Sequence, residues 1–273
     1  MCTENSDGIE GQEATATADR RENLRYAYCS EGQLKMDAGI YKALSGAVAQ
    51  MRNLDVASQD LANVNTAGYK RQRLAFSEVL AKRSPAEDRP GGWVAVADQR
   101  TQLGQGAVAG TGNPLDIAIE GDGFFVIQTS RGERYTRNGG FTLKADGTLI
   151  TPTGDAVLGE GGPVQITGQK VEVASDGTVR SDQGELGRIR IVRFVEPRQV
   201  VKEGANLFVT APPNVQAAGD NVRVVQGSLE QSNMSPIDGM ISLITINRQF
   251  ESYQRAMTLM DSATEKMIAE AAR

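Results

Sequence analysis

The chain has 273 residues and a formal net charge of −5, and 40% of its residues are apolar. This length suits one large domain or two modest domains with a buried core. The acidic balance argues against non-specific nucleic-acid binding, which needs a cationic face. Histidine does not occur, so the most common general base and metal ligand is missing. This absence agrees with the further expectation, based on the motifs discussed below, that the protein is not an enzyme and needs no metal or other cofactor.

The sequence also bears on membrane insertion, secretion and disulfide formation. No apolar run approaches the roughly 20 residues of a membrane span, and no secretory signal peptide is recognisable. These features allow a cytosolic protein, or one exported without a cleaved signal. Both cysteines, Cys2 and Cys29, precede Met36, and a disulfide between them stays open.

Residues 1–35 are polar and aperiodic, and we expect them to be disordered. Two explanations stand side by side. The segment is a real N-terminal extension, or Met36 is the true start and the preceding residues are a translation-start artefact.

A heptad pattern begins after Met36 and predicts a helix over residues 38–62, with Asp37 as its N-cap. Residues 36–80 would form this helix and the segment that leaves it. Asn63 or Asn65 is expected to take the left-handed conformation that ends the helix, and Gly68 adds a second flexible point. The seam residues follow coiled-coil spacing and are Ile40, Leu44, Ala47, Met51, Leu54, Ser58 and Leu61.

The pattern of residues 81–228 predicts a central all-β domain, either a barrel or a sandwich. RIRIVRF, residues 188–194, alternates basic and apolar residues as a strand with one wet face does. NVRVVQ, residues 221–226, is predicted to be the last strand. Asp-Gly pairs flanked by apolar runs predict turns at 122–123, 146–147 and 176–177.

A second helix is predicted from Pro236 to Ala271, within a C-terminal segment of residues 229–273. Ser235 suits its N-cap, and Asp238 lies where a capping-box acid would. Two helices with such seams can pair as a coiled-coil-like hairpin, so the expected fold class is α+β. The seam residues of this helix are Leu243, Ile246, Phe250, Tyr253, Met257, Met260, Thr264 and Met267.

The first turns of this second helix are apolar on nearly every side. A two-helix pair buries one stripe, so the remaining apolar surface must meet something else. Other copies of the protein are the simplest partner, and unlike patches on successive copies build a ring or an open helical filament. A plain helix pair that supports the β domain is the alternative. The residues are Ile237, Met240, Ile241, Leu243, Ile244 and Ile246.

Four stretches, in order, resemble the axial proteins of the bacterial flagellum, the rod and hook proteins. ALSGAVAQMRNLDVASQDLANVNTAGYKRQ, residues 43–72, is similar to their N-terminal signature. GNPLDIAIEGDGFFVIQ and RYTRNGGFTLKADGTLITPTGDAVLG, residues 112–128 and 134–159, resemble their central β domain. QGSLEQSNMSPIDGMISLITINRQFESYQRAM, residues 226–257, resembles their C-terminal block. The length favours a rod protein over a hook protein, and local motifs are more similar to proximal-rod than to distal-rod proteins.

The resemblance implies a structural subunit of the basal-body rod that self-assembles through its terminal helices into the axial tube. That tube transmits torque and forms the export channel. Implied partners are other copies of the chain, other rod proteins and the flagellar type III export apparatus, without membrane insertion. The implied location is the rod in the periplasmic space, reached without a cleaved signal. The family motif turn corresponds to Asn63, Asn65, Thr66, Gly68 and Tyr69.

Other interpretations are weaker. Lys70, Arg71 and Arg73 after the turn are expected to form a solvated basic edge. Glu120 and Asp122 invite comparison with a glycosidase pair, but turn formation explains Asp122 better. The KADGT and ASDGT stretches lack the later acids of a calcium loop and are expected to be hairpin turns. The alternative function is a β-sandwich carbohydrate-binding or hydrolytic module with a helical dimerisation clasp.

Overall fold

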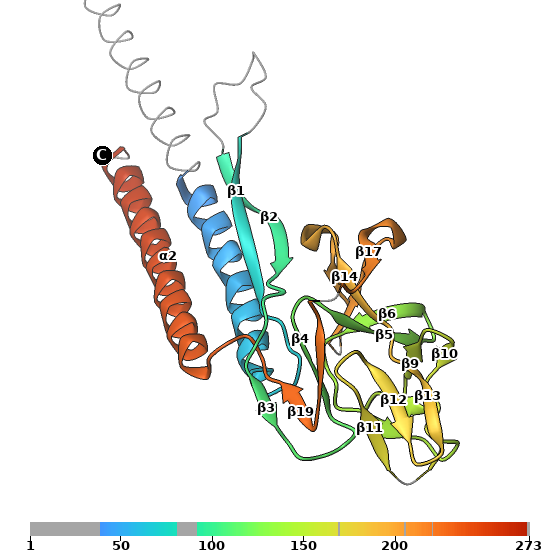
Figure 1. Ribbon diagram of the computed structural model, residues 1–273. Helices are drawn as coiled ribbons and strands as arrows, with labels where there is room; N and C mark the ends of the chain where they lie inside the picture. The colour runs from blue at the N-terminus through green and yellow to red at the C-terminus, as the bar shows by residue number, and fades with distance from the viewer. Residues whose placement is uncertain (1–38, 81–91, 169, 205, 220, 272–273) are drawn as a thin grey trace, which may run out of the picture. The chain divides into compact units, whose positions relative to one another are not determined.

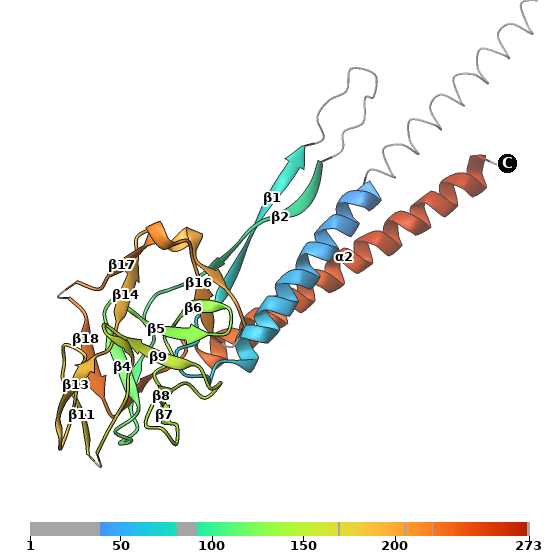
Figure 2. The same ribbon diagram turned by 90° about the vertical axis from the view of Figure 1, so that its right-hand side faces the viewer.

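The computed structural model describes residues 39–80, 92–168, 170–204, 206–219 and 221–271 (Figures 1 and 2). The segment 1–35 and the expected N-cap Asp37 lie outside these residues. The described elements are helices and antiparallel strands, so the α+β class is confirmed. Within the described ranges, no helix has both the length and the apolar character needed to cross a membrane.

The two helices lie near the ends of the described chain. The first occupies residues 39–62, and the second, α2, spans Pro236–Ala271. The end of the first helix at Ala62 and the start of α2 at Pro236 agree with the sequence prediction. In the first turn of α2, the Gly239 amide donates to the Ser235 carbonyl over 3.0 Å.

The chain divides into two compact units, and the boundary crosses both helices. The described part of the first unit comprises residues 39–52, 76–80, 92–96 and 246–271. The second unit comprises residues 53–75 and the described part of 97–245.

In the first unit, the two helices run antiparallel and touch through small residues. Gly46 lies directly under the Tyr253 ring, because a Cβ atom added there would be 2.6 Å from Tyr253 Cε1. Gly39 lies beside Met260, with 3.7 Å from such a Cβ to the methyl carbon. Besides Gly46, the residues buried along this unit's helices are Ala43, Ala47, Ala49 and Ile246.

The seam residues therefore divide into two groups in the lone chain. Ala47 is buried, and Phe250 and Tyr253 are half-buried, but Leu44 and Met51 are exposed. The close approach at Gly46 turns the small residues of the first helix toward α2, which directs Leu44 and Met51 outward. Whether the whole seam serves assembly stays a prediction.

The second unit contains most of the strands, and its largest sheet has ten. The order β15-β16-β6-β5-β9-β8-β7 does not close on itself, so the expected barrel is not found among the described strands. The ten strands are β5 (Phe124–Thr129), β6 (Gly132–Thr136), β7 (Thr142–Leu143), β8 (Leu149–Ile150), β9 (Ala156–Gly159), β10 (Gly162–Pro163), β14 (Ile191–Phe194), β15 (Val201–Lys202), β16 (Leu207–Val209) and β17 (Val215–Ala217).

The remaining strands form smaller sheets, and two short 3₁₀-helices connect strands. The 3₁₀-helices are η1 (Pro197–Gln199) and η2 (Pro212–Asn214). The strands are β1 (Gln72–Leu80) with β2 (Gly92–Thr101), β3 (Val108–Gly110) with β19 (Ser228–Glu230), β4 (Ile117–Glu120) with β18 (Arg223–Gln226), and β11 (Val171–Val173) with β12 (Thr178–Ser181) and β13 (Gly184–Arg188).

Strand β5 explains why the sequence FFVI is apolar without alternation. Phe125 and Ile127 belong to one buried cluster, whereas Phe124 and Val126 belong to another. Successive side chains of a strand point to opposite faces, so β5 contributes to a core on each side.

The turn predictions have mixed outcomes. The Asp-Gly pairs at 146–147 and 176–177 do join antiparallel strand pairs, β7 with β8 and β11 with β12. The chain also bends at 121–122, between β4 and β5, but these two strands do not pair with each other, because β4 pairs with β18 and β5 pairs with other strands. RIRIVRF is divided between β13 and β14, and β19 follows the strand predicted to be last.

Candidate functional site

The chain leaves the first helix through a turn at residues 63–68. The Thr66 amide donates to the Asn63 carbonyl over 3.0 Å, and Asn63 Nδ2 donates to the Gln59 carbonyl over 2.8 Å. Asn63 thus closes the helix with its side chain. The expected left-handed conformation of Asn63 or Asn65 is wrong, since Gly68, at φ +67°, is the residue of this turn with a positive φ.

Gly68 allows the turn to pass very close to another part of the second unit. A Cβ atom here would lie 2.4 Å from the Asn138 nitrogen and 2.5 Å from the Arg137 carbonyl carbon. The Gly68 amide donates to the Glu230 carbonyl over 2.7 Å. Only glycine can both adopt this positive φ angle and fit into this space without a side chain.

Directly after the turn, Lys70 forms a fully buried ion pair with Glu230. Lys70 Nζ lies 2.6 Å from Glu230 Oε1, and both side chains are 0% exposed. Lys70 Nζ also donates to the Gly104 carbonyl over 2.7 Å, and the Gly106 amide donates to Glu230 Oε1 over 2.7 Å. Burial lowers the pKa of Lys70, and the neighbouring Glu230 carboxylate opposes this change.

Arg137, at the end of β6, binds the other oxygen of Glu230. Its Nε donates to Glu230 Oε2, and its Nη2 donates to the carbonyls of Ile119 and Gly121 over 2.9 and 2.7 Å. One buried carboxylate therefore receives two cations, each with further hydrogen bonds to backbone carbonyls. This ion cluster, Lys70–Glu230–Arg137, joins the segment after the first helix to the segment before α2.

The cluster corrects the expectation of a solvated basic edge. Lys70 is buried, and Arg71 is half-buried and donates from Nε to Gln102 Oε1. Of the three cations, Arg73 is exposed as expected.

A second buried group lies around Tyr69. Its hydroxyl donates to Asp60 Oδ1 over 2.8 Å, and Asp60 also accepts the Gln72 amide over 3.2 Å. Lys202 Nζ lies 3.4 Å from the Tyr69 ring centroid and donates to the Lys70 carbonyl over 3.0 Å. Burial raises the pKa of Asp60 and of Tyr69, and it lowers the pKa of Lys202 to about 8.

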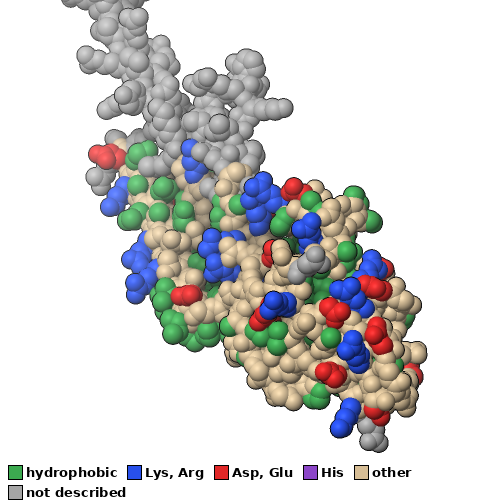
Figure 3. All heavy atoms as spheres, viewed as in Figure 1, with side chains coloured by type: hydrophobic (Ala, Val, Ile, Leu, Met, Phe, Trp, Pro, Cys, Tyr) green, Lys and Arg blue, Asp and Glu red, His purple; other side chains and the backbone are tan. Residues whose placement is uncertain are grey.

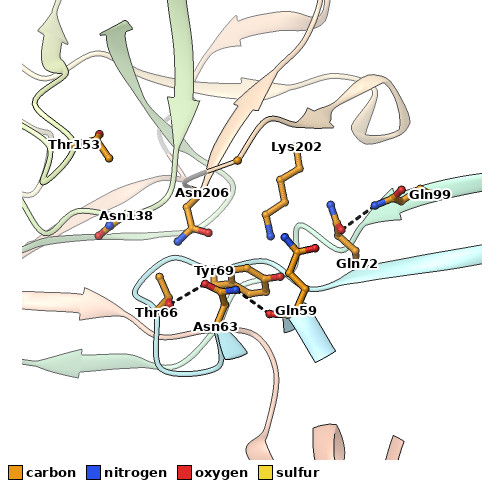
Figure 4. Close-up of a pocket in the computed structure, with 11 residues that line it drawn as sticks. Gln59, Asn63, Thr66, Tyr69, Gln72, Gln99, Asn138, Thr153, Lys202 and Asn206 are labelled. Atoms are coloured by element: carbon orange, nitrogen blue, oxygen red, sulfur yellow. Dashed lines mark hydrogen bonds between the residues drawn. The ribbon is translucent and has the colours of Figure 1, made fainter. Parts of the chain in front are cut away.

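The motif turn also lines a polar cavity of about 400 Å³ in the second unit (Figure 4). Asn63, Thr66 and Tyr69 contribute to its wall, together with Lys202 and Asn206. Asn206 has φ +60°, and its Nδ2 donates to the Ala67 carbonyl over 3.2 Å. Lys202 of β15 and Asn206 in the loop that follows thus hold the turn through its backbone carbonyls at Lys70 and Ala67.

The exposed apolar residues gather on the helices. In the second unit, the first turns of α2 leave Ile237, Met240, Ile241 and Ile244 between 55 and 68% exposed, while Gly239 is buried and Leu243 is half-buried. Figure 3 shows hydrophobic side chains gathered along α2. We call these four residues the α2 apolar face.

In the first unit, the first helix carries an exposed apolar strip of its own. Tyr41, Leu44, Val48 and Met51 are between 47 and 69% exposed. Their spacing places them on one side of the helix. We call them the N-helix apolar strip. The two faces leave large apolar side chains in water, which is typical of surfaces that bind a partner.

The polar residues considered for chemistry show no catalytic arrangement. Glu120 and Asp122 are exposed, and Asp146 and Asp176 accept hydrogen bonds from the amides of Thr148 and Thr178 in their turns. In the described part of the chain, no cluster of three acidic or cysteine side chains could hold a metal ion. Buried Lys70, Glu230 and Arg137 are paired with one another, and buried Asp60 accepts hydrogen bonds from the Tyr69 hydroxyl and the Gln72 amide.

Three protein-family models match the chain. Residues 40–70 match the flagella basal body rod protein model, and residues 118–181 match the flagellar hook protein FlgE/F/G D1 domain. Residues 225–270 match the flagellar basal body rod FlgEFG protein C-terminal model.

Curated relatives match along most of the chain. The flagellar basal-body rod protein FlgF of Caulobacter vibrioides is 35% identical, over 85% of this chain and 98% of the relative. FlgF of Salmonella typhimurium is 31% identical, over 83% of this chain and 95% of the relative. The flagellar basal-body rod protein FlgG of Bacillus subtilis is 30% identical, over 84% of this chain and 97% of the relative.

Proposed function

This chain belongs to the family of flagellar basal-body rod proteins, and we propose that it builds the rod by packing its exposed helix faces against neighbouring subunits. As a family member, it is a structural subunit of the rod, is located in the flagellar basal body and assembles with other rod proteins. FlgF relatives reach 35% identity and FlgG relatives 31%, so the chain is more similar to FlgF.

The exposed α2 apolar face is the observation that carries the proposal. Among the described residues, none buries Ile237, Met240, Ile241 or Ile244, whose side chains are 55 to 68% exposed. Removing such side chains from water is favourable by about 25 cal/mol per Å² of apolar area. The N-helix apolar strip is a second exposed face of different composition, and contacts between unlike faces on successive copies build a ring or an open helical filament, the latter being the form a rod requires.

The finer features of this function are proposals as well. The terminal helices pair as a coiled-coil hairpin that forms the inner layer of the axial tube, with the β domain outside. The tube transmits torque and encloses the export channel. Residues 36–80, 81–228 and 229–273 act as N-terminal axial helix with exit segment, central β domain and C-terminal axial helix.

The proposed function also includes a route of export. The subunit interacts with the flagellar type III export apparatus, passes through the channel unfolded and without a cleaved signal, and assembles in the periplasmic space. Ordering of the terminal helices on meeting a neighbour would delay polymerisation until export is complete.

Ile241→Asp tests the proposal. The variant puts a carboxylate into an interface that becomes dry on assembly, and burying an unpaired charge is costly. We expect the purified variant to keep its circular dichroism spectrum but to stay soluble where the parent chain sediments. In a deletion strain, the variant should not restore motility.

Ser242→Asp is the matched control, since Ser242 is exposed on another side of the same helix. It should assemble like the parent chain. If Ile241→Asp also assembles and restores swimming, α2 does not bind neighbours through this face. The alternative of a carbohydrate-binding or hydrolytic module is not supported by the relatives.

A further inference from the structure

The polar cavity of about 400 Å³ beside the motif turn has an uneven charge composition. Lys202 is a cation in its wall, and the described residues that line the cavity include no acidic side chain. Tyr69, two threonines and a glycine contribute to the wall as well, but most of it consists of carboxamides. Cavities of this volume are large enough to hold a small ligand. The carboxamide residues are Gln59, Asn63, Gln72, Gln99, Asn138 and Asn206.

The amino group of Lys202 is directed into this cavity. Figure 4 shows its side chain pointing toward Tyr69, with the side chains of Gln59 and Asn206 on either side. Lys202 Nζ donates to the Lys70 carbonyl over 3.0 Å and lies 3.4 Å from the centroid of the Tyr69 ring. An ammonium group carries three N–H donors, so one donor remains for a ligand after these two contacts.

No carboxylate in the described part of the chain forms an ion pair with Lys202. The charge of Asp60 acts on Lys202, but the Asp60 carboxylate accepts its hydrogen bond from the Tyr69 hydroxyl instead. Glu203, the next residue along the chain, is bound by two arginine side chains. Lys202 is half-buried, and its burial lowers the pKa of its amino group. The cation has therefore lost part of its hydration without gaining the anion that would replace it.

The chemistry of the wall indicates which anion fits. One ammonium group balances one negative charge, which is the charge of a carboxylate. Phosphate groups are typically bound by arginine forks or by a helix N-terminus, and the described wall of the cavity contains neither. Carboxamides both donate and accept hydrogen bonds, so they can bind the polar groups that accompany a carboxylate.

We propose that this cavity is a carboxylate-binding site, in which Lys202 forms the ion pair and the surrounding carboxamides bind the adjoining polar groups. The carboxylate comes from an acidic side chain of another polypeptide or from a free small carboxylic acid. The site is built by the motif turn and β15 and does not involve the α2 apolar face. It therefore goes beyond the proposed function, and either of the two can fail without the other.

Two capped amino acids test the site on the full chain, below the concentration at which the chain assembles. N-acetylglutamate α-amide carries a side-chain carboxylate, and N-acetylglutamine α-amide is its neutral counterpart of nearly the same shape. At about pH 6.5, Lys202 is protonated and the carboxylate is ionised. We expect the charged probe to shift the NMR signals of the backbone amides around the cavity in a saturable way. The neutral probe should leave these signals unchanged.

Acetate, as a third probe, distinguishes the two sources of the carboxylate. If acetate binds at least as tightly as the capped glutamate, the site takes a free small carboxylic acid. If acetate binds more weakly, the carboxamides contribute through the peptide groups of the probe, and the ligand is an acidic side chain of a polypeptide.

Lys202→Met tests the role of the cation. We expect the dissociation constant of the capped glutamate to rise at least about tenfold, because the ion pair is lost. Lys144→Met is the matched control, since Lys144 is 63% exposed and lies 3.4 Å from Asp146 in a surface turn. The control variant should bind the charged probe as the parent chain does.

Three results would overturn the inference. The first is that neither charged probe produces a saturable shift at the cavity. The second is that the neutral probe binds as tightly as the charged one, because the negative charge would then not be recognised. The third is an unchanged dissociation constant in a folded Lys202→Met variant. If that variant does not fold, the comparison of charged and neutral probes on the parent chain still decides.

Discussion

Lys70 Nζ and Glu230 Oε1 lie 2.6 Å apart without solvent exposure, although 160 positions separate the two residues in the sequence. Lys70 follows the first helix, and Glu230 ends the last strand before α2. The ion cluster with Arg137 thus holds the beginning and the end of the second unit together.

Glu230→Gln should strongly destabilise this unit. The amide keeps the shape of the carboxylate but leaves Lys70 and Arg137 buried without a counter-charge. Loss of one partner from a buried pair costs about 3–5 kcal/mol. Urea denaturation, followed by the far-ultraviolet circular dichroism signal of the backbone, would measure the change in the free energy of unfolding.

Glu133→Gln provides the comparison. Glu133 pairs with Arg190 over 3.0 Å, and the two side chains are 42 and 40% exposed. Such a surface pair contributes about 0–1 kcal/mol. Equal losses in the two variants would contradict the role assigned to the buried cluster.

Gly68→Ala should destabilise the second unit more than Gly112→Ala does. Both glycines have positive φ angles, +67° and +75°. Gly112 has no atom within 4 Å of an added Cβ, so its variant carries only the left-handed strain of about 1–2 kcal/mol. At Gly68, the methyl group would also collide with the backbone at Asn138. Thermal unfolding of both variants measures the difference, and similar melting temperatures would refute the close approach.

Gly46→Ala tests the helix contact of the first unit. Replacing a helical glycine gains about 1 kcal/mol in propensity, but here the methyl group would strike the Tyr253 ring. We expect Gly46→Ala to lower the melting temperature of the helices. In a Tyr253→Val background, the same substitution should raise it, because the obstacle is gone. A gain in both backgrounds would mean that Tyr253 does not pack on Gly46.

Lys202 should give the second unit a specific pH dependence. Burial lowers the pKa of Lys202 to about 8 from its ordinary value of 10.5. Between these values, the unfolded chain binds more protons at this residue than the folded chain, so stability rises with pH. The unfavourable contribution is fully present below about pH 8 and is lost toward pH 10.5.

Comparison with Lys202→Met isolates this contribution. The free energy of unfolding of the parent chain, minus that of the variant, should increase between pH 7.5 and 9.5 in urea titrations. A constant difference across this range would show that Lys202 is not desolvated when the chain is folded.

The helix predictions rested on the heptad spacing of apolar residues. The end of the first helix at Ala62 and the start of α2 at Pro236 follow from local signals, because propensity, caps and turn residues act within a few positions. The same holds for the two Asp-Gly hairpins. The bend near 122–123 does not make a hairpin, because β4 pairs with the distant β18 and β5 pairs with β6, β9 and β14, and pairing partners are not encoded in local alternation.

The candidate site was predictable only in part. The motif turn was visible because polar residues and a glycine follow directly after a helix. The excess apolar residues of α2 were visible because a two-helix pair buries only one stripe. Glu230 and Arg137 were not singled out, because SLEQ and YTRN have the composition of ordinary strand ends. A lysine after a polar turn is usually solvated, and nothing next to Lys70 in the sequence indicates its counter-charge.

The sequence by itself determined the helices, the family signature and the presence of more apolar surface than one chain can cover. These properties depend on spacing along the chain. Only the tertiary structure decided which face of the first helix meets α2, and that Lys70, Glu230 and Arg137 share one buried site. Those outcomes depend on close approach at Gly46 and Gly68, where the absence of a side chain lets distant segments meet.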